Sequence, residues 1–358
     1  MKIVYLTSES YIDHSYTVCR ELEKHIEIRV YLQAKEETAE IESWCKKIGA
    51  EFVKRRRFKN PLSFIGEIIF LLRIRKMKAD VVWFNTLTIY QAFLVNILLK
   101  KFMIVMHDVD IHPETRDRHG LLSAKITIKL ALKNICAASQ TQAEIFQKQH
   151  GFYPPVFQLP IIDYYKECGE EAGETAGRDM VQFFFFGSVE KYKGIEILLE
   201  AAEILQEKHL EFGLKIYGRL KYDSQEISGR IHALKNTVLI NEFIDYRRIH
   251  SIYCQNDILV LPYRQVTQCG PLLIGYSEGV PAICSSLDGF REYVDDGIDS
   301  LLFDNTPGGL ASRMEEIIRD KSIIKKLSKG IEVNTMKKFS MAALTDMYLA
   351  NFNKCMNS

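Results

Sequence analysis

The stretch VQFFFFGSVEKYKGIEILLEAAEIL, residues 181–205, predicts a strand, a glycine-bounded loop and a helix in direct succession. Residues 181–186 are apolar except for Gln182, a pattern typical of a buried strand. From Ile195 to Ala202, apolar residues recur at the spacing of one helix face. A strand that leads directly into a helix is the unit from which parallel α/β sheets are built.

The loop of this stretch predicts an anion site. It lies between Gly187 and Gly194 and carries Lys191 and Lys193. The unpaired N–H groups in the first turn of the following helix, together with the positive end of its dipole, point toward the loop. We therefore expect a ligand that bears phosphate.

The length and composition indicate a globular protein with two domains. The 358 residues exceed what one ordinary core supports. Apolar residues make up 47% and charged residues 26% of the chain, as in average globular domains. The net charge of +1 gives no general reason to expect nucleic acid as a partner.

The cysteines and the N-terminus indicate the cellular compartment. The eight cysteines show no CxxC spacing and no histidine at the spacing of a zinc site, and several lie in apolar runs. We therefore expect buried, reduced thiols instead of disulfides or metal ligands. The chain begins with a predicted strand, and no apolar run reaches the roughly 20 residues that span a bilayer. These observations favour a cytoplasmic protein.

Strand and helix patterns alternate along both halves of the chain. Strands are predicted at residues 2–7, 26–32, 51–53, 79–85, 102–108, 134–139, 156–161, 181–186, 213–218, 237–241, 257–263, 281–286 and 301–303. This alternation predicts the α/β class, with two Rossmann-like, doubly wound parallel sheets facing a central cleft.

The segment 166–179 interrupts this alternation. It is polar, acidic and glycine-rich, and it lacks periodicity, which is typical of an exposed linker. We therefore predict an N-terminal domain of residues 1–165 and a C-terminal domain of residues 180–338, followed by a helix at 339–358.

Four motifs in the second half occur in the order of a known family. They are FFGSVEKYKG (185–194), YCQNDILVLPY (253–263), TQCGPLLIGYSEGVPAI (267–283) and DGFREYVDDGIDSLLF (288–303). In these motifs the chain resembles the retaining GT-B glycosyltransferases of family 4, also called glycosyl transferases group 1, in the branch with a TQSG-type donor motif. The first half resembles the family more loosely, through its strand pattern and the HD pair at 107–108.

The resemblance implies transfer of a sugar from a nucleotide diphosphate sugar held by the C-terminal domain. The N-terminal domain would offer the acceptor surface, and the helix at 339–358 would return to it. No metal or other cofactor is expected, because cationic side chains and helix starts stabilise the charge that develops on the leaving diphosphate. Lys193 occupies the position of the family's lysine, and we assign the diphosphate to it and to the backbone of Gly187 and Ser188.

The chain departs from the family at two places. Ser188 replaces the arginine of the loop, and Lys191 or Arg219 are open as substitutes for that cation. Two glutamates of the wider family's donor motif are absent, as in the TQSG branch, and Val266 and Ile274 occupy their positions.

The remaining donor-binding groups are expected at the start of a helix. They are the side chains of Thr267 and Gln268 and the backbone around Cys269 and Gly270. Pro271 suits the first helical turn, where its missing N–H would have no partner. These groups can bind hydroxyls and phosphate.

Several residues have two alternative roles each. His107 either acts as a catalytic residue beside the reacting sugar or only holds its loop. Phe243 either flanks the nucleotide base or packs in the core. Glu292 either contacts the ribose or caps the helix that starts there. Glu278 is expected to be a solvent-exposed helix end.

The acceptor side is expected to include His14 and Ser15, in the loop after the first strand, and Asp108. Asp108, Val109 and Asp110 also form a DxD triplet, which is the manganese motif of the GT-A fold. The four GT-B motifs outweigh this triplet, so we expect no metal there.

A basic cluster precedes a predicted apolar helix. The cluster consists of Lys54, Arg55, Arg56, Arg57 and Lys59, and residues 64, 65, 68, 69 and 72 form one apolar face of the helix. It is either the solvated end of an ordinary helix or a peripheral contact between the three arginines and an anionic membrane near a lipid-linked acceptor.

The sequence therefore favours a metal-independent, retaining hexosyltransferase that extends a glycan or lipid-linked saccharide in surface polysaccharide synthesis. Two alternatives stay open. Ser188 and the absent glutamates allow a non-catalytic GT-B protein that binds a partner transferase or a glycan. The same fold also allows a nucleotide-sugar epimerase.

Overall fold

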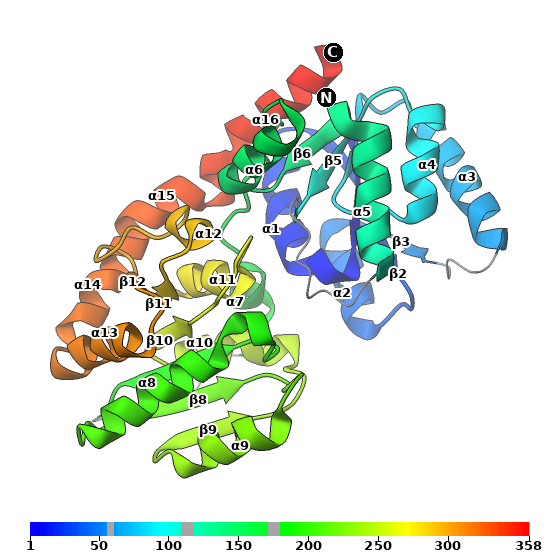
Figure 1. Ribbon diagram of the computed structural model, residues 1–358. Helices are drawn as coiled ribbons and strands as arrows, with labels where there is room; N and C mark the ends of the chain where they lie inside the picture. Colours follow the sequence, from blue (N-terminus) through cyan, green and yellow to red (C-terminus); the bar gives the residue numbers. More distant parts are fainter. Residues whose placement is uncertain (56–60, 109–117, 171–179, 358) are drawn as a thin grey trace. The chain divides into compact units, whose positions relative to one another are not determined.

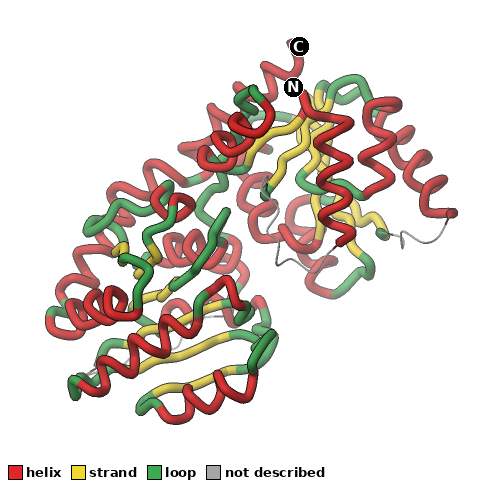
Figure 2. The backbone as a smooth tube through the Cα atoms, in the orientation of Figure 1, coloured by secondary structure: helices red, strands yellow, loops and turns green. Residues whose placement is uncertain are grey.

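The chain forms two compact units. The structure, a computed structural model, describes residues 1–55, 61–108, 118–170 and 180–357. One unit consists of Met1–Pro160 together with Met341–Ser358, and the other of Ile161–Ser340. Each unit is built around one parallel sheet with helices on both of its faces (Figures 1 and 2).

The first sheet has six parallel strands in the order β3-β2-β1-β4-β5-β6. The strands are β1 (Lys2–Ser8), β2 (Glu27–Ala34), β3 (Glu51–Lys54), β4 (Val81–Phe84), β5 (Phe102–Met106) and β6 (Ile135–Ala137). Most of their residues are buried, because helices cover both faces of a doubly wound sheet.

Two groups of helices cover this sheet. The helices of the first unit are α1 (Ile12–Leu22), α2 (Ala39–Ile48), α3 (Pro61–Lys76), α4 (Ile89–Leu98), α5 (Arg118–Ala131), α6 (Gln140–His150) and α16 (Met341–Asn357). On one face, Tyr348 and Phe352 of α16 pack against Trp83, with ring centroids 5.8 and 5.3 Å apart. On the other, Leu71 of α3 and Val95 of α4 join the core, and Figure 1 shows α3, α4 and α5 side by side.

The second sheet repeats the strand order of the first. Its six parallel strands follow the order β12-β11-β10-β7-β8-β9. They are β7 (Gln182–Phe186), β8 (Gly213–Tyr217), β9 (Thr237–Ile240), β10 (Ile258–Leu261), β11 (Ala282–Ser285) and β12 (Leu301–Phe303). Its helices are α7 (Tyr164–Cys168), α8 (Ile195–Glu207), α9 (Ser224–Ala233), α10 (Ile249–Cys254), α11 (Gly270–Glu278), α12 (Asp288–Arg291), α13 (Pro307–Arg319), α14 (Ser322–Gly330) and α15 (Met336–Phe339).

The strand order fixes where a ligand is expected on each sheet. All strands are parallel, but the direction in which successive strands are added to the sheet reverses between β1 and β4 in the first sheet and between β7 and β10 in the second. Doubly wound sheets bind ligands outside the carboxyl ends of their strands at this point. The predicted fold class, two Rossmann-like parallel sheets, is confirmed.

Some predicted elements differ from the structure. The predicted strand at 156–161 is wrong: only Val156 pairs, with Ala137. Pro155 directly precedes this segment and Pro160 lies in it, and proline has no N–H to donate to a ladder. The sequence analysis also missed α2, which begins where the Thr38 side chain accepts a hydrogen bond from the N–H of Ile41.

The predicted linker 166–179 is only partly open to comparison. Residues 166–168 belong to helix α7 instead, and residues 171–179 lie outside the described part of the chain.

Within the described residues, no helix has both the length and the apolar composition needed to cross a bilayer.

Candidate functional site

Glycines fix the loop after β7 in one backbone path. Gly187 has a φ of +116° and Gly218, after β8, a φ of +140°. A Cβ on Gly218 would lie 2.0 Å from the carbonyl oxygen of Gly187, and a Cβ on Gly194 would lie 2.1 Å from that of Pro262. Contacts this short exclude any side chain. The loop 187–194 is therefore held against the ends of β8 and β10, at the reversal point of the sheet.

This loop buries the ammonium group of Lys193, a residue only 8% exposed. Its Nζ lies 3.0 Å from the position of a Cβ on Gly187, and 5.6 and 5.9 Å from the ring centroids of Tyr263 and Tyr192. Among the described residues, no carboxylate forms an ion pair with it. Burial lowers the pKa of Lys193, although the charges of Cys269 and Glu190 oppose this shift. A buried cation that stacks on aromatic faces and forms no ion pair is suited to an anionic ligand.

Helix α11 begins beside this lysine. Its N-cap residue Cys269 is buried, and burial raises the pKa of the Cys269 thiol to about 11, opposed in part by the charge of Lys193. Pro271 lies in the first turn. A Cβ on Gly270 would meet no atom within 4 Å, so the space at the start of the helix is open. Lys193 and this helix start can therefore act on one anion.

Ser188 is engaged within the loop. Its hydroxyl donates to Oε1 of Glu190 at 2.7 Å. The N–H of Val189 donates to the carbonyl oxygen of Arg219 at 2.9 Å, so the exposed Arg219 flanks the loop. Lys191 is also exposed in the same loop. Both candidates for the missing cation stay predictions.

For both Phe243 and Glu292, the structure excludes one of the two alternative roles. Phe243, in the loop after β9, is 81% exposed, which excludes core packing and leaves base flanking as a prediction. Glu292 follows α12, and its N–H donates to the carbonyl oxygen of Asp288. The helix begins at Asp288, so Glu292 ends it, and the expected capping of its start is wrong. The ribose contact stays a prediction.

In the first unit, a hydrogen-bond network lies at the carboxyl ends of β1, β4 and β5. Asn85, directly after β4, donates from Nδ2 to Oγ1 of Thr7 at 3.5 Å. Its Oδ1 lies 2.8 Å from Nε2 of His107, so the Nε2–H of His107 donates to Asn85. The ring of Tyr11 stacks on His107 with centroids 4.1 Å apart. His107 is therefore held in one orientation at the reversal point of this sheet.

The predicted loop position of His14 and Ser15 is wrong. A short turn (Glu9–Tyr11) leads from β1 directly into α1, and both residues lie in the first helical turn. The Ser15 hydroxyl forms hydrogen bonds with Tyr5 and Thr7, at 2.9 and 2.7 Å. Ser15 therefore joins the network that includes Asn85.

His14 is buried, with 5% of its surface exposed. Its ring nitrogens have no hydrogen-bond partner among the described residues, and its ring meets that of His107 edge-on at 6.2 Å. Burial, with a smaller contribution from His107, lowers the pKa of His14 to about 3. His14 is therefore a neutral imidazole.

Other predicted residues are only partly placed. Thr267 and Gln268 are half-buried before Cys269, and Asp108 is exposed after His107. Val109 and Asp110 of the DxD triplet, and Arg56, Arg57 and Lys59 of the basic cluster, lie outside the described residues. The two groups of candidate residues, around Lys193 and around His107, belong to different units.

Helix α3 presents apolar side chains to solvent. Ile65 is 54%, Ile69 62% and Leu72 38% exposed, whereas Leu71 and Ile74 on the opposite face are buried. On neighbouring α4, Phe93 and Ile97 are also exposed. We call these exposed residues (64, 65, 69, 72, 93 and 97) the α3–α4 apolar surface. An exposed apolar patch of this kind is typical of an interaction site.

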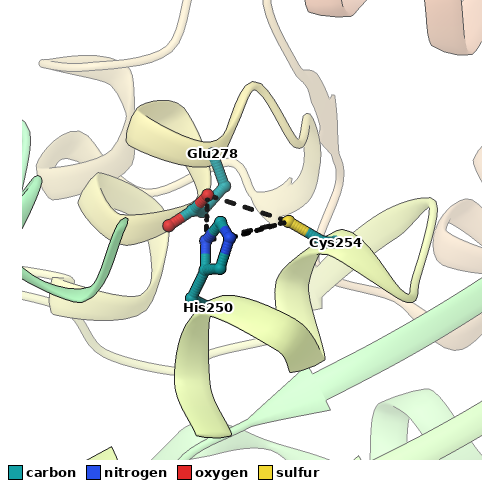
Figure 3. Close-up of side chains that lie close together, drawn as sticks. All are labelled: His250, Cys254 and Glu278. Atoms are coloured by element: carbon teal, nitrogen blue, oxygen red, sulfur yellow. Dashed lines mark hydrogen bonds and ion pairs between the residues drawn. The ribbon is translucent and has the colours of Figure 1, made fainter. Parts of the chain in front are cut away.

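Two expectations about the second unit are wrong. Glu278 is not solvent-exposed: 2% of its side chain is accessible, and it pairs with His250 at 2.9 Å. The sequence analysis found no histidine at zinc spacing, yet His250 and Cys254 lie one helical turn apart and meet Glu278 (Figure 3). The i, i+4 spacing of His250 and Cys254 in IHSIYC places both side chains on one helix face, which the sequence shows. The carboxylate of Glu278 comes from another helix, so the sequence does not show that it joins them.

The family model that matches this chain covers part of the second unit. Residues 181–320 match the family model of glycosyl transferases group 1. The chain is 22% identical over 146 residues to an uncharacterized 41.2 kDa protein in the cps region of Klebsiella pneumoniae. That match spans 39% of this chain and 37% of the Klebsiella protein.

Solved structures match over the whole chain. HepE of Anabaena, solved with UDP and glucose, superposes with a TM-score of 0.73 at 14% identity, over 99% of this chain and 100% of that one. A glycosyltransferase of Rickettsia africae gives 0.75 at 14% identity, over 100% and 99%. The UDP-GlcNAc 2-epimerase of Neisseria meningitidis, bound to UDP-GlcNAc, gives 0.62 at 12% identity, over 99% and 100%. The chain has the GT-B fold.

Proposed function

We propose that this chain is a retaining glycosyltransferase that moves a sugar from a nucleotide diphosphate sugar to a glycan or lipid-linked saccharide. The single observation that carries the proposal is the buried ammonium of Lys193, which forms no ion pair with a carboxylate among the described residues. The match of residues 181–320 to glycosyl transferases group 1 supports the same activity.

The donor diphosphate is the anion that fits this place best. The loop offers Lys193, whose ammonium lies next to the backbone at Gly187, and the start of α11 at Gly270 offers open space next to the positive end of a helix dipole. When the glycosidic bond breaks, negative charge grows on the leaving diphosphate. A cation that is already desolvated stabilises that charge more strongly than one in water, because little solvent has to reorganise. Transfer of this kind needs no divalent cation at the diphosphate.

HepE is described as a complex with UDP and glucose, and the Klebsiella relative lies in a cps region. These relatives favour a uridine nucleotide as donor and surface polysaccharide as product. Phe243, exposed at the carboxyl end of the second sheet, is assigned to the base. The acceptor side is assigned to the His107 network, in which Asn85 and Tyr11 fix the ring.

The α3–α4 apolar surface is assigned to peripheral contact with an anionic membrane. Ile65 and Ile69 offer apolar contact, while Arg75, Lys76 and Lys78 at the end of α3 are exposed cations. This combination is typical of helices that lie in the membrane interface. It would bring the enzyme to a lipid-linked acceptor.

A nucleotide-sugar epimerase is the second candidate, since UDP-GlcNAc 2-epimerases share the fold. The two activities differ in their products. Incubation of the purified protein with UDP-sugars, with and without saccharide acceptors, separates them: a transferase releases UDP and extends the acceptor, and an epimerase converts one UDP-sugar into another.

Turnover of Lys193→Ala tests the proposal. We expect at least a tenfold lower rate, the scale of one lost charge-stabilising contact. Lys235→Ala is the matched control, because this exposed lysine lies before the amino end of the edge strand β9, whereas the loop with Lys193 lies at the carboxyl ends of the strands. A Lys193→Ala enzyme as fast as the wild type would remove the assignment.

A further inference from the structure

Three side chains of metal-ligating type converge in the second unit, away from the residues assigned to the donor. His250 and Cys254 come from α10 and Glu278 from the end of α11 (Figure 3). Oε2 of Glu278 lies 2.9 Å from Nδ1 of His250 and 3.9 Å from Sγ of Cys254. Sγ of Cys254 lies 3.8 Å from Nδ1 of His250.

The fold brings these groups together for local reasons. His250 and Cys254 are four residues apart, so they share one face of α10. Tyr253 of α10 donates its hydroxyl hydrogen to the carbonyl oxygen of Pro271, and a Cβ on Gly275 of α11 would lie 3.5 Å from the ring of Tyr253. This close packing aligns the two helices. Helix α11 then ends at Gly279, which has a φ of +72°, so Glu278 lies in its last turn.

The spacing of the three atoms matches one face of a tetrahedral zinc site. Zinc bond lengths of about 2.0–2.1 Å to nitrogen and oxygen and about 2.3 Å to sulfur place such ligand atoms roughly 3.3–3.6 Å apart. The three observed separations are 2.9, 3.8 and 3.9 Å. Movements of about 0.4 Å, within the freedom of a side-chain torsion, close the difference.

The cluster has more electron-pair donors than hydrogens to satisfy them. The side chain of Glu278 is only 2% accessible, and its Oε1 has no hydrogen-bond partner among the described residues. The thiol of Cys254 carries one hydrogen but lies within 3.9 Å of both ring nitrogens and of the carboxylate. A buried carboxylate oxygen without a donor is costly. A cation bound between the three groups, at Oε2, would neutralise the charge of this buried carboxylate and so lower the cost of its burial.

We propose that His250, Cys254 and Glu278 bind a zinc ion. A thiolate and a carboxylate together carry the charge that neutralises Zn²⁺, and a neutral imidazole completes a ligand set that zinc accepts. The side chain of His250 is 19% accessible, which leaves room for water as a fourth ligand.

The ion has a structural role beyond the proposed transferase chemistry. It ties α10 to the last turn of α11, whose first turn carries Gly270. The two ends of this nine-residue helix are about 12 Å apart at 1.5 Å per residue. Zinc therefore fixes the helix that faces the donor without touching the donor.

Zinc binding must release the thiol proton. Burial, and then the charge of Glu278, raises the pKa of Cys254, while the ammonium of Lys166 on α7 opposes this shift.

The experiment uses the full chain, stripped with a chelator and titrated with Co²⁺ as a spectroscopic probe for zinc. We expect one equivalent to produce the near-ultraviolet charge-transfer absorption of a cobalt–thiolate bond, and one equivalent of Zn²⁺ to displace it and raise the Tm. Cys254→Ser removes the absorption, and Cys355→Ser, a half-buried thiol of the first unit, keeps it. No absorption in the wild type, or its persistence in Cys254→Ser, would overturn the proposal.

A second variant keeps the test decisive if Cys254→Ser does not fold. Glu278→Gln keeps the size of the side chain but removes its charge, and we expect at least tenfold weaker Zn²⁺ binding. Unchanged Zn²⁺ affinity in a folded Glu278→Gln protein contradicts the site. Nucleoside diphosphate binding, measured in the same samples, depends on Lys193 and reports on the proposed function separately.

Discussion

At the scale of single residues, buried ionisable groups distinguish functional positions from packing. Lys193 is buried beside aromatic rings and forms no ion pair with a carboxylate, and the buried ring of His14 has no hydrogen-bond partner, in both cases among the described residues. Each of these groups lowers stability in its ionised form, because burial penalises the charge. A function that needs the charge of Lys193 explains why that residue is present, whereas His14 stays neutral.

Lys193→Met should stabilise the ligand-free protein. A base whose pKa is lower in the folded than in the unfolded chain binds fewer protons when folded, so its ionisation opposes folding at neutral pH. Removing the buried charge should raise the free energy of unfolding by about 1 kcal/mol at pH 7. The gain should shrink as the pH approaches the ordinary pKa of lysine. Urea unfolding at several pH values measures both effects, and a destabilised Lys193→Met protein would contradict the account.

His14→Leu should remove a sensitivity to acid. The pKa of His14 is about 3 in the folded chain and close to the ordinary value of 6.5 when unfolded, so the unfolded chain binds the extra proton and stability falls as the pH drops below 6.5. By this linkage the free energy of unfolding of the wild type is lower by about 2 kcal/mol at pH 5 than at neutral pH, and the variant lacks this loss. Urea unfolding at pH 5 and pH 7.5 measures the difference. The exposed His232→Leu serves as control, and an equal pH dependence in His14→Leu and wild type would exclude this explanation.

At the scale of elements, strand ends and helix faces decide what each segment can do. The loop after β7 is fixed by backbone contacts in which no side chain fits. Helix α3, in contrast, keeps a row of apolar side chains at its surface although its opposite face already supplies the core. Neither feature follows from secondary-structure propensity alone.

Gly218→Ala should destabilise the second unit by about 2 kcal/mol or more, because its φ of +140° and a carbonyl oxygen 2.0 Å from the new Cβ both oppose a side chain. Gly229→Ala is the matched control. Gly229 lies inside α9 with no atom within 4 Å of a Cβ. Alanine at this position should therefore raise the free energy of unfolding by roughly 0.5–1 kcal/mol. Thermal unfolding of both variants measures the contrast, and equal effects would show that the loop can move aside.

Replacing Ile65 and Ile69 of α3 by serine should weaken binding to vesicles of anionic phospholipid about tenfold, because two exposed apolar side chains are lost from the contact. Flotation of the full chain with such vesicles measures the change in membrane binding. Val238→Ser, at an exposed apolar position on β9 in the second unit, should have no effect. Equal flotation of the double variant and the wild type would remove the membrane assignment.

At the scale of the whole molecule, the chain repeats one strand order in two units, and Met341–Ser358 groups with the first. Apolar runs predicted this architecture because buried parallel strands are continuous in sequence. The glycine and lysine pattern at 187–194 predicted an anion site in this loop, since one short segment holds the whole signal, and the structure buries Lys193 there. Positions that depend on separate elements were not predictable: Asn85 orients His107 from another strand, and Glu278 is buried because α10 packs on its helix.

The central claim is that Lys193 and the start of α11 bind the diphosphate of an activated sugar. Calorimetric titration of the full chain with UDP, GDP and ADP tests it most directly. We expect one of these nucleotides to bind, its Kd to rise at least tenfold in Lys193→Met, and its Kd to stay unchanged in Lys235→Met. Binding of none of the three nucleotides, or equally tight binding by Lys193→Met, would contradict the account.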